Sequence, residues 1–372
     1  MKISRDLVHE LPKVELHCHL DGSLRIPTII DLAQRDKVKL PYTDEDQLKN
    51  ILSAGKKRGT LEDYIKRFDI TLSVMQTPES LTRSAFELAE DAASENVRYI
   101  EIRYSPILHT QKGLTPTESV EAVKKGLKKA EKKFNIRCGI IVCGIRSIKP
   151  EASLQLADLT LKYKNKGVVG FDLAGVEENF PAKDHREAFY MILNHNINAT
   201  IHAGEAFGPE SIHQAIHYCG AHRIGHGTRL KEDKELMQYV NDHRITLEVC
   251  ILSNYHTKSV RSLNNHTVRN YYDQGIRITL NTDNRLISNT TMTDEFMLAH
   301  KLFGFNLYDF REVTITAIKS AFIHYKERKN MIRSIANELE GNFGLMPEYI
   351  EPVSYTHLRA HETDSYLVCR LV

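Results

Sequence analysis

Two histidines two positions apart lie near the start of the chain, in the segment Val14-Glu15-Leu16-His17-Cys18-His19-Leu20-Asp21-Gly22. On a β-strand, alternate side chains share a face, so His17 and His19 would point the same way. Two imidazoles that converge at the end of a buried strand supply half of a tetrahedral metal site. The alternative is a pair of polar strand-end residues, because His-x-His is a weak motif in a chain with 18 histidines. The other half of the site has to be found downstream.

Two later strand-like runs end in further metal-ligand types, at His202 and at Asp283. Together with His17 and His19 they give three imidazoles and one carboxylate, a nitrogen and oxygen set that suits Zn²⁺ at about 2.0 to 2.2 Å. Zinc lowers the pKa of a bound water from 15.7 toward ~7, which makes hydroxide available at neutral pH. We therefore expect one Zn²⁺ per chain, which supplies the nucleophile of a hydrolytic reaction.

Two more residues follow the same strands and have the side chains of a general acid and base. Glu205 comes three positions after His202, on the turn that leaves the strand, where it faces a substrate without binding the metal. His226, between Gly225 and Gly227, ends the next strand. It can take the proton of the water or hold the water in place, and the glycines permit close backbone approach. A purely structural role is the alternative for His226.

These side chains have to be positioned by a regular alternation of strands and helices. Alternation of this kind implies a parallel sheet, and eight units predict an α/β fold of the (β/α)8 TIM-barrel type, whose carboxyl strand ends converge on one catalytic mouth. An open dinucleotide-binding sheet is the alternative, but the Gly-x-Gly-x-x-Gly turn expected after the first strand is missing. The predicted strands are 14–20, 97–104, 138–145, 168–174, 199–202, 223–226, 246–250 and 277–281.

A long helical insertion is predicted after the first strand, from Leu24 to about Ser94. A start signal at Thr77-Pro78-Glu79 precedes a helix over residues 81–93. An apolar stripe is predicted on one helix before it, and its pattern alone indicates core packing. The stripe consists of Leu61, Tyr64, Ile65, Phe68, Leu72 and Met75.

Composition favours a small-molecule partner. The 372 residues carry 50 basic and 48 acidic side chains, for a net charge of +2, so no surface for nucleic acid or an anionic membrane is indicated. Neither a membrane span nor a secretory signal is evident, and the six scattered cysteines show no disulfide or zinc spacing. We predict a cytoplasmic protein without an obligate protein partner.

We predict a single domain over residues 1–352. Residues 353–372, which begin Val353-Ser354-Tyr355-Thr356-His357, have no helical or strand period. They look like translated sequencing-adapter sequence rather than native protein, and we expect them to lie outside the fold.

Six motifs, in order and with similar spacing, resemble those of the adenosine deaminase family over about residues 11–343. They are Leu16-His17-Cys18-His19-Leu20-Asp21-Gly22, Arg103-Tyr104-Ser105-Pro106, Asp172-Leu173-Ala174-Gly175, His202-Ala203-Gly204-Glu205, Ile224-Gly225-His226-Gly227 and Asn281-Thr282-Asp283. The resemblance implies a zinc-bearing barrel that hydrolyses the 6-amino group of adenosine, and of 2′-deoxyadenosine, to inosine and ammonia in purine salvage.

Residue roles are also implied by this resemblance. Zinc would be held by His17, His19, His202 and Asp283, while Glu205 would protonate purine N1 and His226 would orient or deprotonate the water. The Gly175 N–H would meet N3, and Asp21 would meet the ribose 5′-hydroxyl. The stripe that includes Leu61, Tyr64 and Phe68 would form an apolar lid over the purine.

Two positions depart from the commonest family pattern. Asn284 stands where many members carry a second aspartate that faces purine N7, and Arg285 stands where they carry proline. Some bacterial-type members share the asparagine, so we expect Asn284 to bind the base.

Three other functions are alternatives to adenosine deamination. Adenine and AMP are alternative substrates, although Asp21 would repel a 5′-phosphate. A non-catalytic binding relative would show eroded ligands. A different metal-dependent hydrolase with two metal ions would usually carry a bridging lysine on the fourth strand, where Asp172-Leu173-Ala174-Gly175 stands instead.

Overall fold

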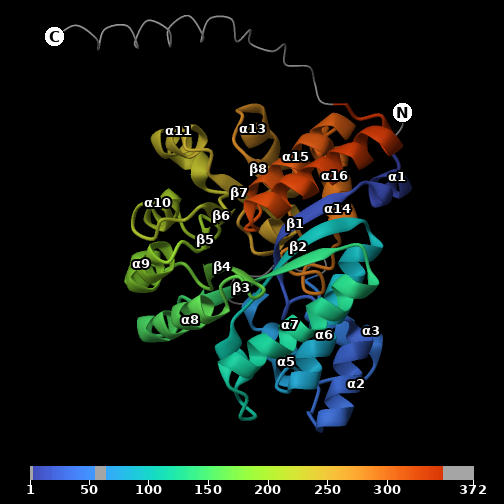
Figure 1. Cartoon of the computed structure of the whole chain (residues 1–372), viewed down its shortest axis with the longest axis vertical. Helices are drawn as coiled ribbons and strands as arrows, with labels where there is room; N and C mark the ends of the chain where they lie inside the picture. Colours follow the sequence, from blue (N-terminus) through green and yellow to red (C-terminus); the bar gives the residue numbers. More distant parts are fainter. Residues whose placement is uncertain (1–2, 55–63, 347–372) are drawn as a thin grey trace, which may run out of the picture.

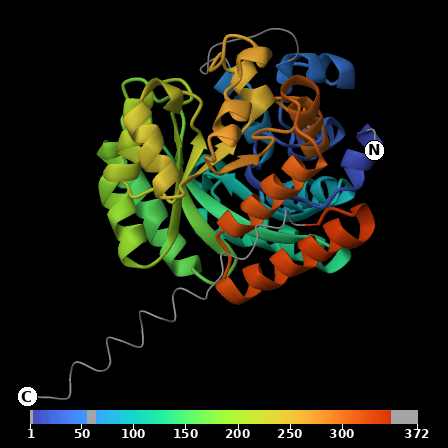
Figure 2. The same cartoon turned by 90° about the horizontal axis from the view of Figure 1, so that it is seen from above.

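The protein is described from a computed structural model, in which residues 3–54 and 64–346 are placed. Eight strands form one sheet in chain order, and each strand is parallel to the next. Helices connect the strands and lie around them (Figures 1 and 2). This arrangement confirms the predicted (β/α)8 TIM barrel with a helical insertion after the first strand.

The observed strands agree with the predicted ones to within one or two residues. They are β1 Lys13–His19, β2 Val97–Tyr104, β3 Arg137–Ile145, β4 Val168–Ala174, β5 Asn198–Ala203, β6 Arg223–His226, β7 Thr246–Val249 and β8 Ile278–Leu280. The α-helices are α1 Arg5–Glu10, α2 Ile26–Asp36, α3 Glu45–Leu52, α5 Phe68–Val74, α6 Pro78–Ser94, α7 Pro116–Lys133, α8 Pro150–Tyr163, α9 Arg186–Asn194, α10 Pro209–His217, α11 Lys234–Asp242, α12 Ile251–His256, α13 Val268–Asp273, α14 Met292–Phe303, α15 Leu307–Ser320 and α16 Tyr325–Phe343.

The barrel closes between β1 and β8, at the residues that were predicted to bind metal. The His19 N–H donates to the Asp283 carbonyl at 2.7 Å, and the Asp283 N–H donates to the His17 carbonyl at 3.0 Å. These two bonds join the first strand to the segment after the last one. They hold the backbone of His17, His19 and Asp283 together at the carboxyl end of the barrel.

Side-chain caps determine where several of the connecting helices begin. Thr77 accepts the Ser80 N–H before α6, as the start signal predicted, and Thr115 and Glu118 form a reciprocal capping box before α7. Proline occupies the first turn of α6 and α7, where its missing N–H costs no helical hydrogen bond. The observed helix starts can be predicted from the sequence because a cap is an interaction between residues close together in the chain.

The apolar stripe after the first strand differs from the prediction in one respect. Tyr64 and Ile65 are helical, but a turn at residues 66–67 separates them from α5, which begins at Phe68. The prediction of one continuous helix over the stripe was therefore wrong. The apolar spacing continues across the turn, so periodicity alone could not reveal it. Leu61 lies outside the described residues.

Charged side chains fill part of the barrel interior. Arg103 on β2 donates to Asp172 at 2.9 Å and to Glu248 at 2.8 Å, and Arg223 on β6 donates to Glu248 at 2.6 Å and also to Glu101. The side chains of all five residues are at most 2% exposed. A buried carboxylate needs such paired donors, because an uncompensated buried charge is strongly destabilising.

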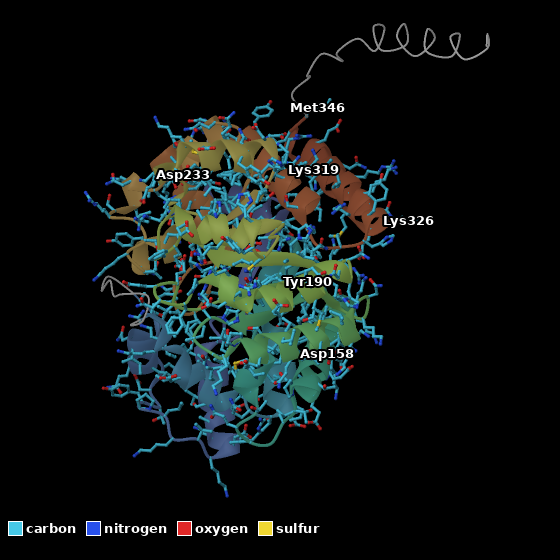
Figure 3. The ribbon with its side chains drawn as sticks, turned by 90° about the vertical axis from the view of Figure 1, so that its left-hand side faces the viewer. Asp158, Tyr190, Asp233, Lys319, Lys326 and Met346 are labelled. Carbon is cyan, nitrogen blue, oxygen red and sulfur yellow. The ribbon has the colours of Figure 1, made fainter. Side chains whose placement is uncertain are left out.

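The outer helices carry the polar surface of the barrel. Figure 1 shows α8, α9, α10 and α11 following one another along one side, while the helices of residues 26–133 gather below. Asp158, Tyr190 and Lys319 lie on outward helix faces, as Figure 3 shows from the side. No helix of the described residues is long and apolar enough to cross a membrane. Residues 353–372 lie outside the described part, so the domain limit at 352 stays a prediction.

Candidate active site and metal centre

The carboxyl ends of β1, β5 and β8 bring three imidazoles and one carboxylate together. The Asp283 Oδ1 atom lies 3.3 Å from the His17 Nε2 atom and 3.4 Å from the His19 Nε2 atom. The His202 Nε2 atom lies 3.1 Å from that of His19. The structure thus places the four predicted metal ligands in one cluster, as their strand positions required.

His226 from β6 joins the same cluster. Ligand atoms of His17, His202, His226 and Asp283 all lie within 4.8 Å of one another. This tight set contains His226 in place of His19, so distance alone does not separate the predicted metal ligands from the residue predicted to face the water. The hydrogen bonds of each ring provide a second criterion.

Buried carboxylates fix the protons of two rings. The His17 Nδ1 atom lies 2.8 Å from Glu248 Oε2, and the His202 Nδ1 atom lies 3.1 Å from Asp172 Oδ2. A carboxylate only accepts, so each Nδ1 carries the proton and each Nε2 keeps its lone pair. The His17 Nε2 atom is buried and has no hydrogen-bond partner. A metal ion would satisfy this nitrogen, so the residues fit such an ion.

Asp283 is held in an uncommon backbone conformation. Its φ angle is +60°, and that of His226 is +66°, both in the left-handed region that non-glycine residues seldom adopt. Ser253 donates to Asp283 Oδ2 at 2.5 Å. Burial alone would raise the pKa of the Asp283 carboxyl, but the close approach of His17 and of the other imidazoles lowers it well below its usual value. The Asp283 carboxylate is therefore anionic.

Glu205 is a carboxyl whose side chain is almost fully buried beside the cluster. Burial raises its pKa well above the usual value, and the charges of Asp283 and Glu177 raise it further. Its Oε2 atom lies 3.5 Å from the His226 Nε2 atom. A carboxyl whose pKa is raised is suited to donate a proton during hydrolysis. This geometry agrees with the general-acid position predicted for Glu205.

A cavity of about 330 Å³ opens beside the cluster, a size that suits a small-molecule ligand. Its described lining combines residues of the histidine and aspartate cluster with apolar side chains. Burial raises the pKa of Asp21 in this lining to about 7. The lining includes the predicted substrate residues His19, Asp21, Tyr64, Phe68, Gly175 and Asn284.

A scan against protein-family models matches the adenosine deaminase model over residues 12–338. The chain belongs to the adenosine deaminase family. An adenosine deaminase of Clostridium botulinum (strain Langeland) is 40% identical over 333 residues, which cover 89% of this chain and 99% of that protein. A probable adenosine deaminase of Dictyostelium discoideum is 41% identical over 87% of this chain, which spans 42% of that longer protein.

Solved structures of related deaminases share the fold. The apo structure of the N6-methyl-AMP deaminase from Arabidopsis thaliana has a TM-score of 0.81 and 26% identity, covering 91% of this chain and 100% of that one. A cog1816 amidohydrolase of Burkholderia ambifaria with bound zinc has a TM-score of 0.83 over 92% and 94% of the two chains; its 23% identity shows the fold alone. The family is metal-dependent, and the histidine and aspartate cluster lies where this family chemistry needs it.

Several residues that support the family site were not singled out from the sequence. Glu248 orients His17, Glu177 accepts backbone N–H groups around Glu205, and Ser253 holds Asp283. A charged residue inside the apolar run Thr246-Leu247-Glu248-Val249 was the available signal for Glu248. Glu177 and Ser253 lie in connecting segments, where the sequence offered no periodic signal.

Arg285, which replaces the proline found in many family members, has a structural role. Its guanidinium donates to Glu15 Oε2 at 2.6 Å and also to Glu95. Glu15 in turn accepts the N–H of Thr282, next to Asp283. Arg285 therefore ties the segment after β8 to β1 and to the end of α6, which a proline could not do.

Proposed function

We propose that this protein hydrolyses adenosine, and 2′-deoxyadenosine, to inosine and ammonia. The observation that carries the proposal is the buried Glu205 carboxyl, whose pKa is raised, in the lining of one cavity with a cluster of imidazoles that could hold a metal ion. Relatives about 40% identical over most of the chain, named adenosine deaminase, support the same substrate.

The metal proposed for this site is Zn²⁺, held by His17, His19, His202 and Asp283. Two of the imidazoles direct an unprotonated Nε2 inward, and a nitrogen-rich set with one carboxylate suits zinc. When bound, zinc supplies a hydroxide nucleophile at neutral pH. His226 is proposed to interact with the nucleophilic oxygen and not to bind the metal.

The protein side chains then prepare the purine for attack. Glu205 donates its proton to purine N1, which drains electron density from C6 and makes that carbon more electrophilic. The Gly175 N–H meets N3, Asn284 meets N7, and Asp21 meets the 5′-hydroxyl of the ribose. Tyr64 and Phe68 cover the base with their apolar rings, and Leu61 is proposed for the same role.

A nucleoside fits the described cavity lining better than a nucleotide. Asp21 and Asp69 line the cavity, and the described lining residues include no lysine or arginine. A phosphate group needs a cationic partner to offset its charge, and the acidic side chains of this lining do not supply one. AMP is therefore the weaker candidate, and adenine lacks the ribose that Asp21 would bind.

One assay compares the candidate substrates directly. Zinc-loaded protein is mixed with adenosine, 2′-deoxyadenosine, adenine or AMP, and the change in purine absorbance on deamination is followed. We expect kcat/KM for the two nucleosides to exceed that for adenine and AMP at least about a hundredfold, the discrimination that lost polar contacts produce. Faster turnover of adenine or AMP would overturn the proposed substrate.

The metal assignment has its own test. His17→Ala should lose bound zinc and activity together, whereas His213→Ala, on the exposed face of α10, should change neither. Chelation of wild-type protein should lower its melting temperature, and added Zn²⁺ should restore it, because a ligand that binds only the native state stabilises it. Full activity without bound metal would refute the site.

A further inference from the structure

A chain of hydrogen bonds connects His226 to a backbone N–H group, which can act only as a donor. The Val268 N–H at the start of α13 donates to the His266 Nδ1 atom at 3.1 Å. A backbone N–H can only donate, so this Nδ1 carries no proton. Burial lowers the pKa of His266 to about 3, so its ring is neutral and holds its single proton on Nε2.

Asn254 on α12 is the next residue in this chain of hydrogen bonds, and it accepts one hydrogen bond and donates the next. The His266 Nε2 atom lies 3.1 Å from the Asn254 Oδ1 atom, which accepts its proton. This bond fixes the orientation of the amide, so the Nδ2 group is the one that faces His226. The Asn254 Nδ2 atom lies 3.0 Å from the His226 Nδ1 atom. An amide nitrogen only donates, so the His226 Nδ1 atom accepts.

The proton of neutral His226 is therefore left on Nε2, the nitrogen that lies 3.5 Å from Glu205. This is the reverse of His17 and His202, whose Nδ1 atoms face carboxylates. All three residues of the chain of hydrogen bonds are buried, with exposed fractions of 1% for His226, 0% for Asn254 and 6% for His266. The rings of His17, His202 and His226 around one cluster thus differ in proton placement because their outer partners differ.

We propose that Asn254 and His266 are positioning residues that hold His226 in the Nε2–H form. In this form His226 donates a hydrogen bond to the attacking oxygen and orients it, and it has no Nε2 lone pair for the metal. This assignment rests on the proposed deamination. It also explains why His226 lies within ligand distance of the cluster without being one of the metal ligands.

Nitrogen-15 spectroscopy of the zinc-loaded, substrate-free protein tests the proton placement directly. Long-range proton–nitrogen spectra of histidine-labelled protein distinguish protonated from bare ring nitrogens, and His226→Gln identifies the signals of His226. We expect a bare Nδ1 and a protonated Nε2. A protonated Nδ1, or an Nε2 with the shift of a metal-bound nitrogen, would overturn the proposal. The readout needs no turnover, so it stands even if adenosine is not the substrate.

Two variants test the functional consequence. In Asn254→Asp a carboxylate of the same shape accepts from Nδ1, which moves the proton of His226 off Nε2. We expect kcat to fall about 10² to 10³-fold, the usual loss of one transition-state donor, while KM changes less than about threefold. His266→Gln keeps an acceptor for Val268 and a donor for Asn254, so it should retain kcat.

The pair separates positioning from simple packing. A packing role predicts that both variants lose melting temperature and activity alike, which would contradict the proposal. Unchanged kcat in Asn254→Asp, with the nitrogen-15 signals of His226 exchanged, would contradict it as well. If Asn254→Asp does not fold, the nitrogen-15 spectrum of the wild type and the kcat of His266→Gln still test the proposal.

Discussion

The Glu177 carboxylate accepts the backbone N–H of Glu205 at 2.8 Å. The same carboxylate accepts the N–H groups of Gly204 and Ala206, each at 2.9 Å. Glu177 is 3% exposed and follows β4, so a single buried side chain holds the whole turn after β5. Gly204 in this turn has a φ angle of +66°, and a Cβ there would lie 2.5 Å from Ile212. The position of the acid therefore depends on a residue from the neighbouring strand.

Glu177→Gln should disturb this turn without removing a group that meets the substrate. The amide offers one acceptor oxygen, so at least one buried N–H loses its partner at a cost of about 1 to 3 kcal/mol. We expect kcat to fall about tenfold to a hundredfold, with bound zinc unchanged. The neighbouring variant Glu178→Gln, at an exposed position, is the control and should behave as wild type. Equal kinetics in the two variants would rule out this role.

Glu205→Gln should remove the proton donor and keep the metal. Glutamine has nearly the same shape but no proton of suitable acidity, so kcat should fall by about 10² to 10⁴-fold. Zinc content and turnover are measured on one preparation, with Glu210→Gln on α10 as an exposed control. Turnover near that of wild type with zinc bound would refute the proposed mechanism.

The sequence predicted the strands and the cluster well because both follow from local pattern. His17, His202 and Asp283 end strand-like runs, and parallel strands bring their carboxyl ends to one mouth. Eight such units predict a closed barrel, in which residues far apart in the chain are neighbours. The motifs then added roles that pattern alone does not give.

The outer partners could not be predicted in the same way. Glu248 reaches His17 across the barrel interior, and His266 reaches His226 through Asn254, contacts that depend on side-chain direction rather than on period. The turn at residues 66–67 was missed for a related reason, since the apolar spacing continues through it. Hydrogen-bond polarity also requires coordinates, and it is what distinguishes His226 from His17 and His202.

A buried carboxyl away from the cluster should make stability depend on pH. Glu295 on α14 accepts the Ile251 N–H at 2.9 Å and the Thr290 hydroxyl at 2.9 Å, and burial raises its pKa from 4.5 to about 8. Between these values the native state keeps a proton that the unfolded state has lost. The free energy of unfolding contributed by Glu295 therefore falls as pH rises, and it levels off above about pH 8.

Urea unfolding at pH 5 to 9, at constant zinc, measures this contribution. The difference in unfolding free energy between wild type and Glu295→Gln should decrease by a few kcal/mol up to about pH 8, because glutamine does not titrate. Glu340→Gln, exposed on α16, should show no such trend. A difference that is constant with pH would show that Glu295 is ionised in the native protein.

Asn284 is the residue proposed to recognise purine N7. Its side chain is buried, its Oδ1 atom has no hydrogen-bond partner, and it lines the cavity. That oxygen packs against Gly22, where a Cβ would lie 1.8 Å away, so this glycine leaves room for the amide. Purine N7 is an acceptor, and the amide nitrogen of asparagine donates at any pH, whereas an aspartate needs a shared proton. Asn284→Asp should therefore add an alkaline decrease in kcat/KM that wild type lacks.

The contact itself is tested by combining a variant with a modified substrate. Asn284→Ala should cost roughly 1 to 3 kcal/mol of transition-state binding, because the buried acceptor N7 loses its donor. Wild type should lose a similar amount with 7-deazaadenosine, which has no N7. The variant should lose almost nothing further with that substrate, since the same hydrogen bond cannot be removed twice. If the two losses instead add, Asn284 does not contact N7, and another residue must read that edge of the purine.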